Sequence, residues 1–413
     1  MKLLFYGINH SPELAGIGKY TGEMAAWFAA NGHEVRVITA PPYYPAWKVG
    51  PGYSASQYRT ESLQGATVYR APLWVPLQPG GLKRLLHLAS FALSSLPVLL
   101  AQWRWKPDVV WVVEPPLMCA PAAAAFASLR GVKSWLHIQD YEVDAAFDLG
   151  LIKGAALRRW VAGAERWLMR RFDRVSTISG RMVERARAKG VAPERVVHFS
   201  NWVDIGGITP LAAPSAYRAE LGLAQDAVVA LYSGNMGNKQ GLEILADVAR
   251  LLQGESHIRF VFGGNGSGRA DLQARCAGLP NVRFLDLQPL GRLNHWLGLA
   301  DVHLLPQRAD AADLVMPSKL TGMLASGRAV LATAHAETEL GRVVAQEAAC
   351  GLVVPPENAS AMAEALRTLA ADPARRLELG ANGRRYAERE LSQDVILRRF
   401  EAQLLAMVQG DAA

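Results

Sequence analysis

The feature that most constrains the fold is a repeated alternation of short apolar runs with longer helical patterns, in both halves of the 413-residue chain. Residues 3–8 and 33–40 are strand-like, and residues 18–32 between them have the period of an amphipathic helix. The second half resumes the alternation at residues 227–236. Strands that alternate with helices predict an α/β fold with parallel sheets covered on both faces.

The chain is too long for one compact core, so we expect two domains. Glycines and prolines between residues 206 and 214 are typical of a linker. We therefore predict one Rossmann-like domain over residues 1–205 and a second over 206–389. The helical pattern of 390–413 is predicted to pack back on the first domain. Ligands of such sheets bind beyond the carboxyl ends of the strands, which predicts a ligand cleft between the domains.

Cysteine usage and the first residues bear on the cellular compartment. The chain has three widely spaced cysteines, which predict neither a disulfide framework nor a zinc site. Its start, MKLLFYGINH, is typical of a first strand and has too short an apolar part for a secretory signal. We expect a cytoplasmic protein without a bound metal.

Charge is unevenly distributed. Residues 1–205 hold 24 Lys and Arg against 15 Asp and Glu, whereas the rest of the chain holds 20 against 22. The basic half suits an anionic membrane surface, a pyrophosphate-bearing acceptor or nucleic acid. No motif that binds RNA or DNA accompanies the charge, so nucleic acid is the weakest of these partners.

Two segments of the basic half favour a membrane surface. The apolar run 85–103 contains His87 and Pro97 and is borderline for a span, so a buried or membrane-surface helix fits it better. Residues 156–174 form a basic amphipathic pattern that carries Trp160 and Trp167. A core helix with a solvated basic face is the alternative.

The loop after the first strand does not match the known dinucleotide or ATP motifs. It lacks GxGxxG, the second strand ends in Thr39-Ala40 instead of an acid, and GxxxxGK[ST] is absent from the chain. This disfavours an NAD enzyme and a P-loop ATPase. Gly16 and Gly18 in this loop still allow close approach to a phosphate, although an ordinary flexible loop is equally compatible.

A phosphate site is also predicted in residues 308–334. Pro317-Ser318-Lys319 comes before an apolar helical run that ends at Gly327. Ser318 is a good N-cap residue, so the helix start and the Lys319 ammonium would together bind phosphate. This arrangement suits a nucleotide diphosphate.

Several of these motifs together resemble a known family. SPELAGIGKYTGEMAAWFAANGHEVRVITAPPYYP, SGNMGNKQGLE, FGGNG and ADVHLLPQRADAADLVMPSKLTGMLASG are similar to the family-4 glycosyltransferases of the GT-B fold, over nearly the whole chain. Within that family they resemble the exopolysaccharide branch that includes the colanic acid fucosyltransferase. The resemblance implies a retaining transferase that needs no metal or other cofactor. It implies a nucleotide-sugar donor, with GDP-fucose as the specific expectation, and a polyprenyl-diphosphate-linked saccharide as acceptor.

The family's donor residues carry over unevenly. Asn235 stands where the family has an Arg, and Lys239 lies one position before the usual Lys. The two glutamates of the family's E-x7-E signature fall on Leu314 and Gly322, and Asp313 is the nearest acid. The predicted donor-site residues are Gly16, Gly18, Gly234, Asn235, Lys239, Gly264, Asp313, Pro317, Ser318 and Lys319.

His137 and Asp140 are the predicted catalytic residues. His137 comes late in an apolar run, so we expect it at a strand end that faces the cleft. A neutral imidazole hydrogen-bonds a sugar or accepts a proton, and the family has a functional histidine after this strand. A buried structural histidine is the alternative. Asp140 is the second choice.

Two other functions remain open at this point. A sugar-nucleotide 2-epimerase of the same fold would convert the donor without an acceptor. A non-catalytic partner in polysaccharide assembly is compatible with the missing glutamates. For a transferase with this acceptor, we expect peripheral association with the inner face of the plasma membrane.

Overall fold

The chain divides into two compact units. The computed structural model describes residues 1–13, 16–77, 80–148, 154–237, 240–309 and 317–410. Unit 1 is Met1–Ser200 with Leu397–Ala413, and unit 2 is Asn201–Ile396. The chain therefore passes between the units at 200/201 and 396/397, where the sequence predicts 205/206 and 389/390.

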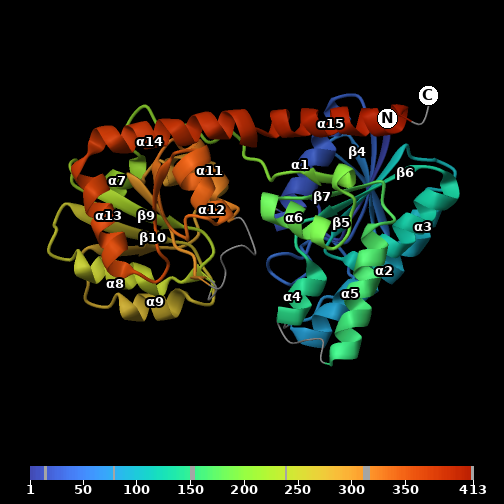
Figure 1. Ribbon diagram of the computed structural model, residues 1–413, viewed down its shortest axis with the longest axis horizontal. Helices are drawn as coiled ribbons and strands as arrows, with labels where there is room; N and C mark the ends of the chain where they lie inside the picture. Colours follow the sequence, from blue (N-terminus) through green and yellow to red (C-terminus); the bar gives the residue numbers. More distant parts are fainter. Residues whose placement is uncertain (14–15, 78–79, 149–153, 238–239, 310–316, 411–413) are drawn as a thin grey trace. The chain divides into compact units, whose positions relative to one another are not determined.

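Within the described residues, unit 1 has an eight-stranded sheet in the order β3-β4-β2-β1-β5-β6-β7-β8. Only the β3–β4 pair is antiparallel among these strands. The strands are β1 (Lys2–Tyr6), β2 (Glu34–Thr39), β3 (Arg59–Leu63), β4 (Ala66–Arg70), β5 (Val109–Glu114), β6 (Lys133–Ile138), β7 (Arg174–Thr177) and β8 (Val196–His198). The helices are α1 (Gly16–Ala30), α2 (Gly81–Ala101), α3 (Ala120–Arg130), α4 (Glu142–Asp148), α5 (Ala155–Met169) and α6 (Gly180–Ala188). Helices cover both faces of this sheet (Figure 1).

Burial explains why these runs form strands. All six residues of β5, VVWVVE, are buried, as expected for a central strand of a parallel sheet with two covered faces. The edge strand β3, RTESL, is largely exposed and carries charge. Charged side chains on an edge strand discourage pairing with another chain.

Unit 2 has six parallel strands in the order β11-β10-β9-β12-β13-β14 among its described residues. The strands are β9 (Val228–Ser233), β10 (Ile258–Gly263), β11 (Val282–Leu285), β12 (Val302–Leu305), β13 (Ala329–Thr333) and β14 (Gly351–Val354). The helices are α7 (Ala216–Glu220), α8 (Glu243–Leu251), α9 (Arg269–Arg275), α10 (Leu293–Leu297), α11 (Lys319–Ala325), α12 (Glu339–Arg342), α13 (Ala359–Ala371) and α14 (Pro373–Tyr386). Counted from β9, this is the 3-2-1-4-5-6 order of the Rossmann fold.

The strand order of each sheet predicts where a ligand binds. The order reverses between β1 and β5 in unit 1 and between β9 and β12 in unit 2. Open α/β sheets bind ligands outside the carboxyl ends of the strands at such a reversal. Each unit therefore offers one candidate edge.

The last helix, α15 (Gln393–Gln409), contributes to the core of unit 1. Phe400 is buried, and its ring centre lies 4.8 Å from that of Trp135 and 5.9 Å from that of Phe28. Glu401 pairs with His33, at 2.5 Å between carboxylate oxygen and ring nitrogen. The end of the chain thus completes the hydrophobic core of unit 1.

The predicted linker is an ordered turn of unit 2. The Asp204 carboxylate accepts hydrogen bonds from the Gly206 and Gly207 amides, at 3.0 and 2.8 Å. Arg384 of α14 donates to the Ile205 carbonyl at 2.9 Å. Glycines at this turn leave room for the Asp204 side chain, because a Cβ on Gly207 would lie 2.4 Å from it. The composition of a linker and of a tight turn is similar, which explains the displaced boundary.

Candidate functional site

The loops after β9 and β10 meet through their backbones at the carboxyl edge of the unit 2 sheet. Gly234 and Gly264 have φ angles of 122° and 137°. A Cβ on Gly264 would lie 1.9 Å from the Gly234 carbonyl oxygen. Beyond the two glycines along these loops, the Met236 amide donates to the Asn265 carbonyl at 2.9 Å. Only glycine fits this contact, so the two predicted glycines set the shape of this edge.

Lys319 is the first residue of α11 and reaches the end of β9. Its ammonium donates a hydrogen bond to the Tyr232 hydroxyl at 2.8 Å and lies 4.3 Å from the centre of the Tyr232 ring. The same hydroxyl is 2.6 Å from the Asn235 carbonyl oxygen. A Cβ on Gly234 would be 3.5 Å from Lys319 Cε. The structure thus brings Gly234, Asn235 and Lys319 together.

Tyr232 also belongs to this group, although no sequence motif predicted it. It lies at the end of an apolar strand, where an aromatic residue is usually part of the core. Its position, two residues before Gly234, could have indicated that Tyr232 is a site residue. An aromatic hydroxyl at the carboxyl end of a strand in a Rossmann-like sheet lies at the ligand edge.

Lys319 has no carboxylate partner among the described residues. Burial lowers the pKa of its ammonium to about 8, and no charged neighbour contributes to this shift. The group is therefore mostly protonated at pH 7. A half-buried cation with no counter-charge in the described residues favours binding of an anion.

Ser318 is at the predicted position but does not cap the helix. Its backbone is helical, with φ −57° and ψ −24°, and its side chain makes no capping hydrogen bond. The side chain is exposed, and the Ser318 carbonyl accepts a hydrogen bond from Thr321. Pro317 beside it is half-buried. Since α11 has only seven residues, anion binding at this edge depends on Lys319 and not on a capped helix end.

Three residues of the family comparison lie outside the described residues: Lys239, Asp313 and Leu314. Gly322, at the position of the family's second glutamate, is described and lies on α11. A Cβ there would be 3.3 Å from Leu297 Cδ1 and 3.9 Å from Ile208 Cδ1. This position contacts apolar side chains, so it is unsuited to a carboxylate that binds ribose.

His137 lies inside β6, one residue before its end, and not at an exposed strand end. It is 4% exposed. Its Nε2 is 3.0 Å from Gln139 Oε1, and its Nδ1 is 2.8 Å from the Ser176 hydroxyl oxygen. The Gln139 oxygen only accepts hydrogen bonds, so Nε2 carries the proton and Nδ1 accepts from Ser176. The Trp135 ring N–H donates to the same Ser176 oxygen at 2.8 Å, which completes the chain.

This environment corrects the prediction of a catalytic histidine. Burial lowers the pKa of His137 to about 4, so the ring is neutral at pH 7. The ring also stacks on Trp111, with 5.3 Å between centroids. Both ring nitrogens are occupied inside the protein, which leaves none for a sugar or an acceptor hydroxyl. The sequence located the residue but not its burial, since Ser176 and Trp111, which contact its ring, lie on β7 and β5.

Asp140 follows β6 at the carboxyl edge of the unit 1 sheet, and its side chain is exposed. Surrounding protein raises the pKa of its carboxyl to about 6, and the positive charge of Arg84 opposes the rise. The carboxylate is therefore mostly ionised at pH 7 and accepts hydrogen bonds from hydroxyl groups. Of the two predicted catalytic residues, Asp140 has atoms open to a ligand.

Gly16 and Gly18 belong to α1, which begins at Gly16, two residues before the helical pattern that the sequence predicts over 18–32. A Cβ on Gly18 would lie 2.5 Å from Glu13 Oε2. Glu13 is 5% exposed and accepts hydrogen bonds from the amides of Tyr43 and Tyr44, both at 2.9 Å. Gly18 therefore makes room for a buried carboxylate that joins the loops after β1 and β2. Gly16 is exposed at the helix start.

Metal ligands do not gather in the part of the chain that the structure describes. No group of three His, Cys, Asp or Glu side chains there is arranged to hold an ion. Cys119, Cys276 and Cys350 are buried free thiols. The chemistry available at the two edges is therefore an ammonium, an exposed carboxylate and backbone amides.

Comparison with known proteins agrees with this architecture. Residues 15–202 match the model of the glycosyl transferase 4-like domain, and residues 227–372 match that of the glycosyl transferases group 1. A curated protein of Escherichia coli K12, named "Putative colanic acid biosynthesis glycosyl transferase WcaI", is 47% identical over 406 residues, which cover 97% of this chain and 98% of that protein. A D-inositol 3-phosphate glycosyltransferase of Streptomyces bingchenggensis is 26% identical over 81% of this chain and 78% of its own length.

Solved structures share the fold at low identity. A sucrose-phosphate synthase from Thermosynechococcus elongatus has a TM-score of 0.74 at 16% identity, with both chains fully covered. Anabaena HepE, crystallised with UDP and glucose, has a TM-score of 0.69 at 14% identity and covers 98% of this chain and 100% of its own. None of these proteins supports an epimerase or a non-catalytic partner. The chain therefore belongs to the family-4 glycosyltransferases and is a glycosyltransferase of the GT-B fold.

Proposed function

We propose that this glycosyltransferase moves a sugar from a nucleotide-diphosphate donor to a polyprenyl-diphosphate-linked saccharide in exopolysaccharide biosynthesis, with retention of configuration. The observation that carries the donor half is the Lys319 ammonium, which has no carboxylate partner in the described residues and lies beside Gly234. The name of the 47% identical relative supports a role in colanic acid or a similar polymer. We propose GDP-fucose as the donor because of the family resemblance.

The proposed reaction uses the donor diphosphate as the base. The bond between the sugar C1 and the diphosphate oxygen breaks, and the acceptor hydroxyl oxygen bonds to C1 on the same face. The acceptor proton passes to the leaving diphosphate. Negative charge grows on the diphosphate during this step, and a fixed cation such as Lys319 stabilises it. The proposal includes no metal and no other cofactor.

Unit 1 supplies the acceptor side in this proposal. Asp140 is its exposed carboxylate at a strand end, with a pKa of about 6. It accepts a hydrogen bond from the acceptor hydroxyl and orients the oxygen that attacks C1. His137 supports β6 from within and does not touch substrate in this scheme.

Calorimetric titration with nucleoside diphosphates and their sugars tests the donor site. We expect GDP or GDP-fucose to bind best, and Lys319→Met to weaken binding by about 100-fold, because a charge-assisted hydrogen bond contributes about 1.5–3 kcal/mol. Lys48→Met, on an exposed residue of unit 1, is the matched control and should leave binding unchanged. Equal affinity of the Lys319→Met and wild-type proteins would refute the donor site.

Transfer assays with the best donor then distinguish the reaction types. A transferase forms product only when a lipid-linked acceptor is present. Conversion of the donor sugar without an acceptor would point to an epimerase, and binding without turnover on any acceptor would point to a non-catalytic role. Analysis of the product linkage tests retention.

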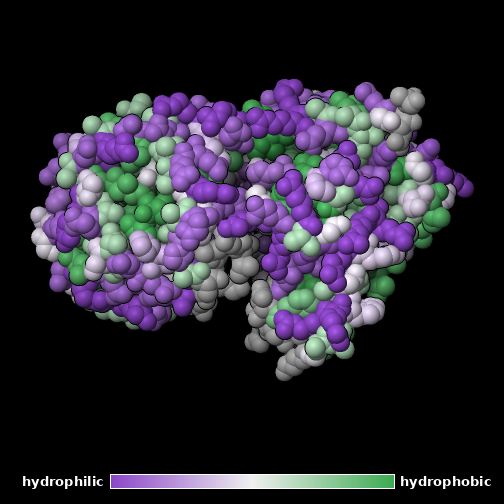
Figure 2. Space-filling view, viewed as in Figure 1, coloured by the Kyte–Doolittle hydropathy of each residue, from purple (hydrophilic) through white to green (hydrophobic). Residues whose placement is uncertain are grey.

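We further propose that unit 1 attaches peripherally to the cytoplasmic face of the plasma membrane. On α5, Trp160 and Trp167 are 71% and 56% exposed, and exposed arginines surround them. Figure 2 shows hydrophilic and hydrophobic residues intermixed over this part of unit 1. Tryptophans among basic residues suit the interface of an anionic bilayer.

Helix α2 adds a second apolar surface. Exposed leucines follow one side of it, at Leu82, Leu86, Leu93 and Leu100. Exposed basic residues flank it: Lys83, Arg84, Arg104 and Lys106. Among the described residues α2 is the single helix long and apolar enough to cross a membrane, with 28% of its most apolar window buried, and such a helix alone is weak evidence. We propose that it lies along the surface, because the basic residues at its two ends then reach the same leaflet.

Vesicle flotation tests membrane attachment. The protein should float with vesicles of phosphatidylcholine and phosphatidylglycerol and much less with phosphatidylcholine alone. The double variant Trp160→Ala, Trp167→Ala should lose most of this binding, whereas Leu287→Ala with Leu377→Ala, on exposed residues of unit 2, should not. Equal flotation with both kinds of vesicle would remove the proposal.

A further inference from the structure

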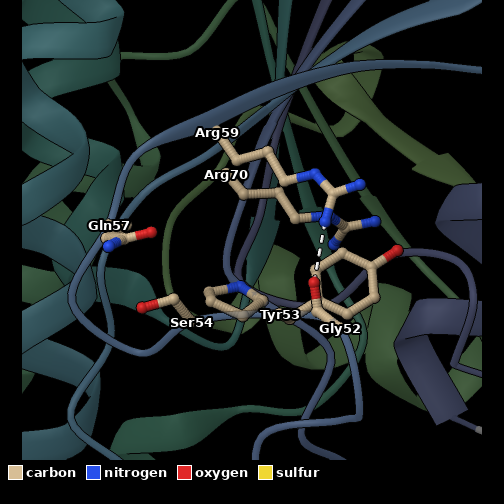
Figure 3. Close-up of a pocket in the computed structure, with 7 residues that line it drawn as sticks. Gly52, Tyr53, Ser54, Gln57, Arg59 and Arg70 are labelled. Carbon is tan, nitrogen blue, oxygen red and sulfur yellow. Dashed lines mark hydrogen bonds between the residues drawn. The ribbon is translucent and has the colours of Figure 1, made fainter.

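A small pocket in unit 1 lies apart from the residues used so far. Its volume is about 210 Å³, and its lining consists of Pro41, Gly52, Tyr53, Ser54, Gln57, Arg59 and Arg70. Figure 3 shows the two guanidinium groups together on one side, next to Tyr53, and the Gln57 and Ser54 side chains on the other. Since β3 runs against β4, Arg59 at the start of β3 and Arg70 at the end of β4 lie at the carboxyl edge of the sheet.

Arg70 is a fixed part of the wall. It is 1% exposed, and its three guanidinium nitrogens donate to Glu61, to the Ala40 carbonyl and to the Ser11 carbonyl, at 2.6 to 2.8 Å. These bonds join the pocket to the loops after β1 and β2. These bonds use three of the five N–H donors of Arg70, and its burial leaves it to act on a ligand mainly through its charge.

Arg59 is the cation that remains available to a ligand. It donates to the Gly52 carbonyl at 2.9 Å, and its Nε lies 3.2 Å from a Glu61 oxygen. Its guanidinium also lies 4.9 Å from the centre of the Tyr53 ring. These contacts hold the group in place, and its second amino nitrogen has no partner in the described residues. About half of the side chain is exposed.

The pairing of these arginines is itself unusual. Arg59 and Arg70 are direct partners in the antiparallel pair β3–β4. Like charges directly opposite each other destabilise a sheet. Glu61 pairs with both guanidinium groups, and the buried Glu13 carboxyl also interacts electrostatically with Arg70. The half-exposed Arg59 guanidinium is therefore the cation that an anion in the pocket can reach.

The opposite wall is polar and uncharged. Gln57 has no hydrogen-bond partner in the described part of the protein, and its amide both donates and accepts. The Ser54 hydroxyl is 3.3 Å from the Ser56 amide nitrogen and hydroxyl oxygen. The volume is below the range of about 300–1,000 Å³ of sites for larger small molecules, so it suits one sugar unit or less. An amide and a hydroxyl facing a guanidinium match a sugar that carries an acidic group.

We propose that this pocket binds an anionic group, a carboxylate or a phosphate, carried by one sugar unit of the acceptor saccharide. Arg59 binds the anion, and Gln57 and Ser54 bind neighbouring hydroxyl groups. The assignment of this ligand to the acceptor saccharide rests on the proposed function. The existence of an anion-binding site in this pocket does not. The pocket then selects acidic acceptors over neutral ones.

Ligand-detected NMR on the full chain tests the site. Methyl β-glucuronide serves as the carboxylate probe, methyl β-glucoside as its neutral counterpart and inorganic pyrophosphate as the phosphate probe. We expect the glucuronide or pyrophosphate to bind at least fivefold more tightly than the glucoside. Arg59→Gln should weaken that binding about tenfold, as loss of a charge-assisted hydrogen bond does. Arg195→Gln removes an equal charge from another exposed site of unit 1 and should change nothing.

The probes separate the sources of the anion. Preference for the glucuronide assigns an acidic sugar. Because pyrophosphate also suits the donor site, preference for it assigns the lipid diphosphate or a sugar phosphate to this pocket only if Lys319→Met keeps that binding and Arg59→Gln loses it. If the hydroxyl groups are bound as proposed, Gln57→Ala should weaken binding of the glucuronide and leave binding of pyrophosphate unchanged. Equal binding of the three probes, or equal losses in Arg59→Gln and Arg195→Gln, overturns the site. Donor titration of the wild-type protein is independent of this result, so failure here leaves the proposed function intact.

Discussion

The loops after the first strands of the two units are held in different ways. In unit 2, the loops after β9 and β10 meet backbone to backbone at Gly234 and Gly264. In unit 1, the loops after β1 and β2 are joined by the buried carboxylate of Glu13 and by Arg70. The same Rossmann-like frame is therefore stabilised by glycine contacts in one unit and by buried charges in the other.

This difference explains which charges remain for ligands. Unit 1 uses Glu13 and Arg70 inside the protein, and Asp140 and Arg59 are exposed or half-exposed charged groups at its strand ends. In unit 2 the loops after β9 and β10 meet through backbone atoms, and Arg269 of α9 also donates to the Gly264 carbonyl at 3.2 Å. The ammonium of Lys319 has no counter-charge in the described residues. We infer that unit 2 is suited to the strong negative charge of a diphosphate. Unit 1 is suited to a saccharide with hydroxyl groups for Asp140 and an acidic group for Arg59.

The largest effect is expected from Gly264→Ala, which disrupts the backbone contact between Gly264 and Gly234 in unit 2. The new Cβ would lie 1.9 Å from the Gly234 oxygen at a φ of 137°, so the loops must separate. We expect the free energy of unfolding to fall by about 3 kcal/mol and donor affinity to fall below detection. Denaturant titration and calorimetry measure the two quantities.

Gly278→Ala is the matched control for that substitution. Gly278 also has a positive φ, of 79°, but nothing lies within 4 Å of its Cβ position. It should cost about 1 kcal/mol and leave donor binding intact. If the Gly264→Ala protein bound a nucleoside diphosphate as tightly as the Gly278→Ala protein, the contact between the two loops would not be needed to form the donor site.

A second comparison separates His137 from Asp140 in unit 1. His137→Ala removes the hydrogen bonds to Ser176 and Gln139 and opens a cavity, so we expect it to destabilise folding by about 2–4 kcal/mol. The folded variant should keep its transfer rate within about threefold. Asp140→Asn should leave stability unchanged and lower the transfer rate by about 100-fold. The reverse pattern would restore His137 as the catalytic residue.

A pH profile sharpens the assignment of Lys319. With a pKa of about 8, the ammonium of the free protein is protonated below pH 8 and loses its proton above it. Donor affinity should therefore fall about twofold between pH 7 and 8 and about tenfold between pH 7 and 9. Lys319→Arg keeps its charge over this range and should show no such fall. If calorimetry showed a donor affinity of the wild-type protein that does not change with pH, binding of the diphosphate would not depend on this ammonium.

The same contrast shows how far the sequence determines the outcome. Apolar periodicity and glycine position are local properties, and they predicted the two sheets together with Gly234 and Gly264 at a strand-end loop. Contacts between distant residues are not local. Tyr232 and Lys319 are 87 positions apart, and His137 is buried by residues of neighbouring strands. The pocket at Arg59 likewise depends on pairing of β3 with β4, which the sequence did not reveal.

The smallest effect is expected at Ser318, where the sequence predicted a helix cap. Its side chain makes no capping bond, so Ser318→Ala should change the free energy of unfolding by less than about 0.5 kcal/mol. Thr338, whose hydroxyl accepts from the Gly341 amide at 3.1 Å at the start of α12, is the contrasting cap. Thr338→Ala should cost about 1 kcal/mol in the same denaturant titration. Donor affinity of Ser318→Ala should remain within about threefold of wild type, because Lys319 supplies the charge. A loss comparable to that of Lys319→Met would mean that the Ser318 hydroxyl itself binds the diphosphate.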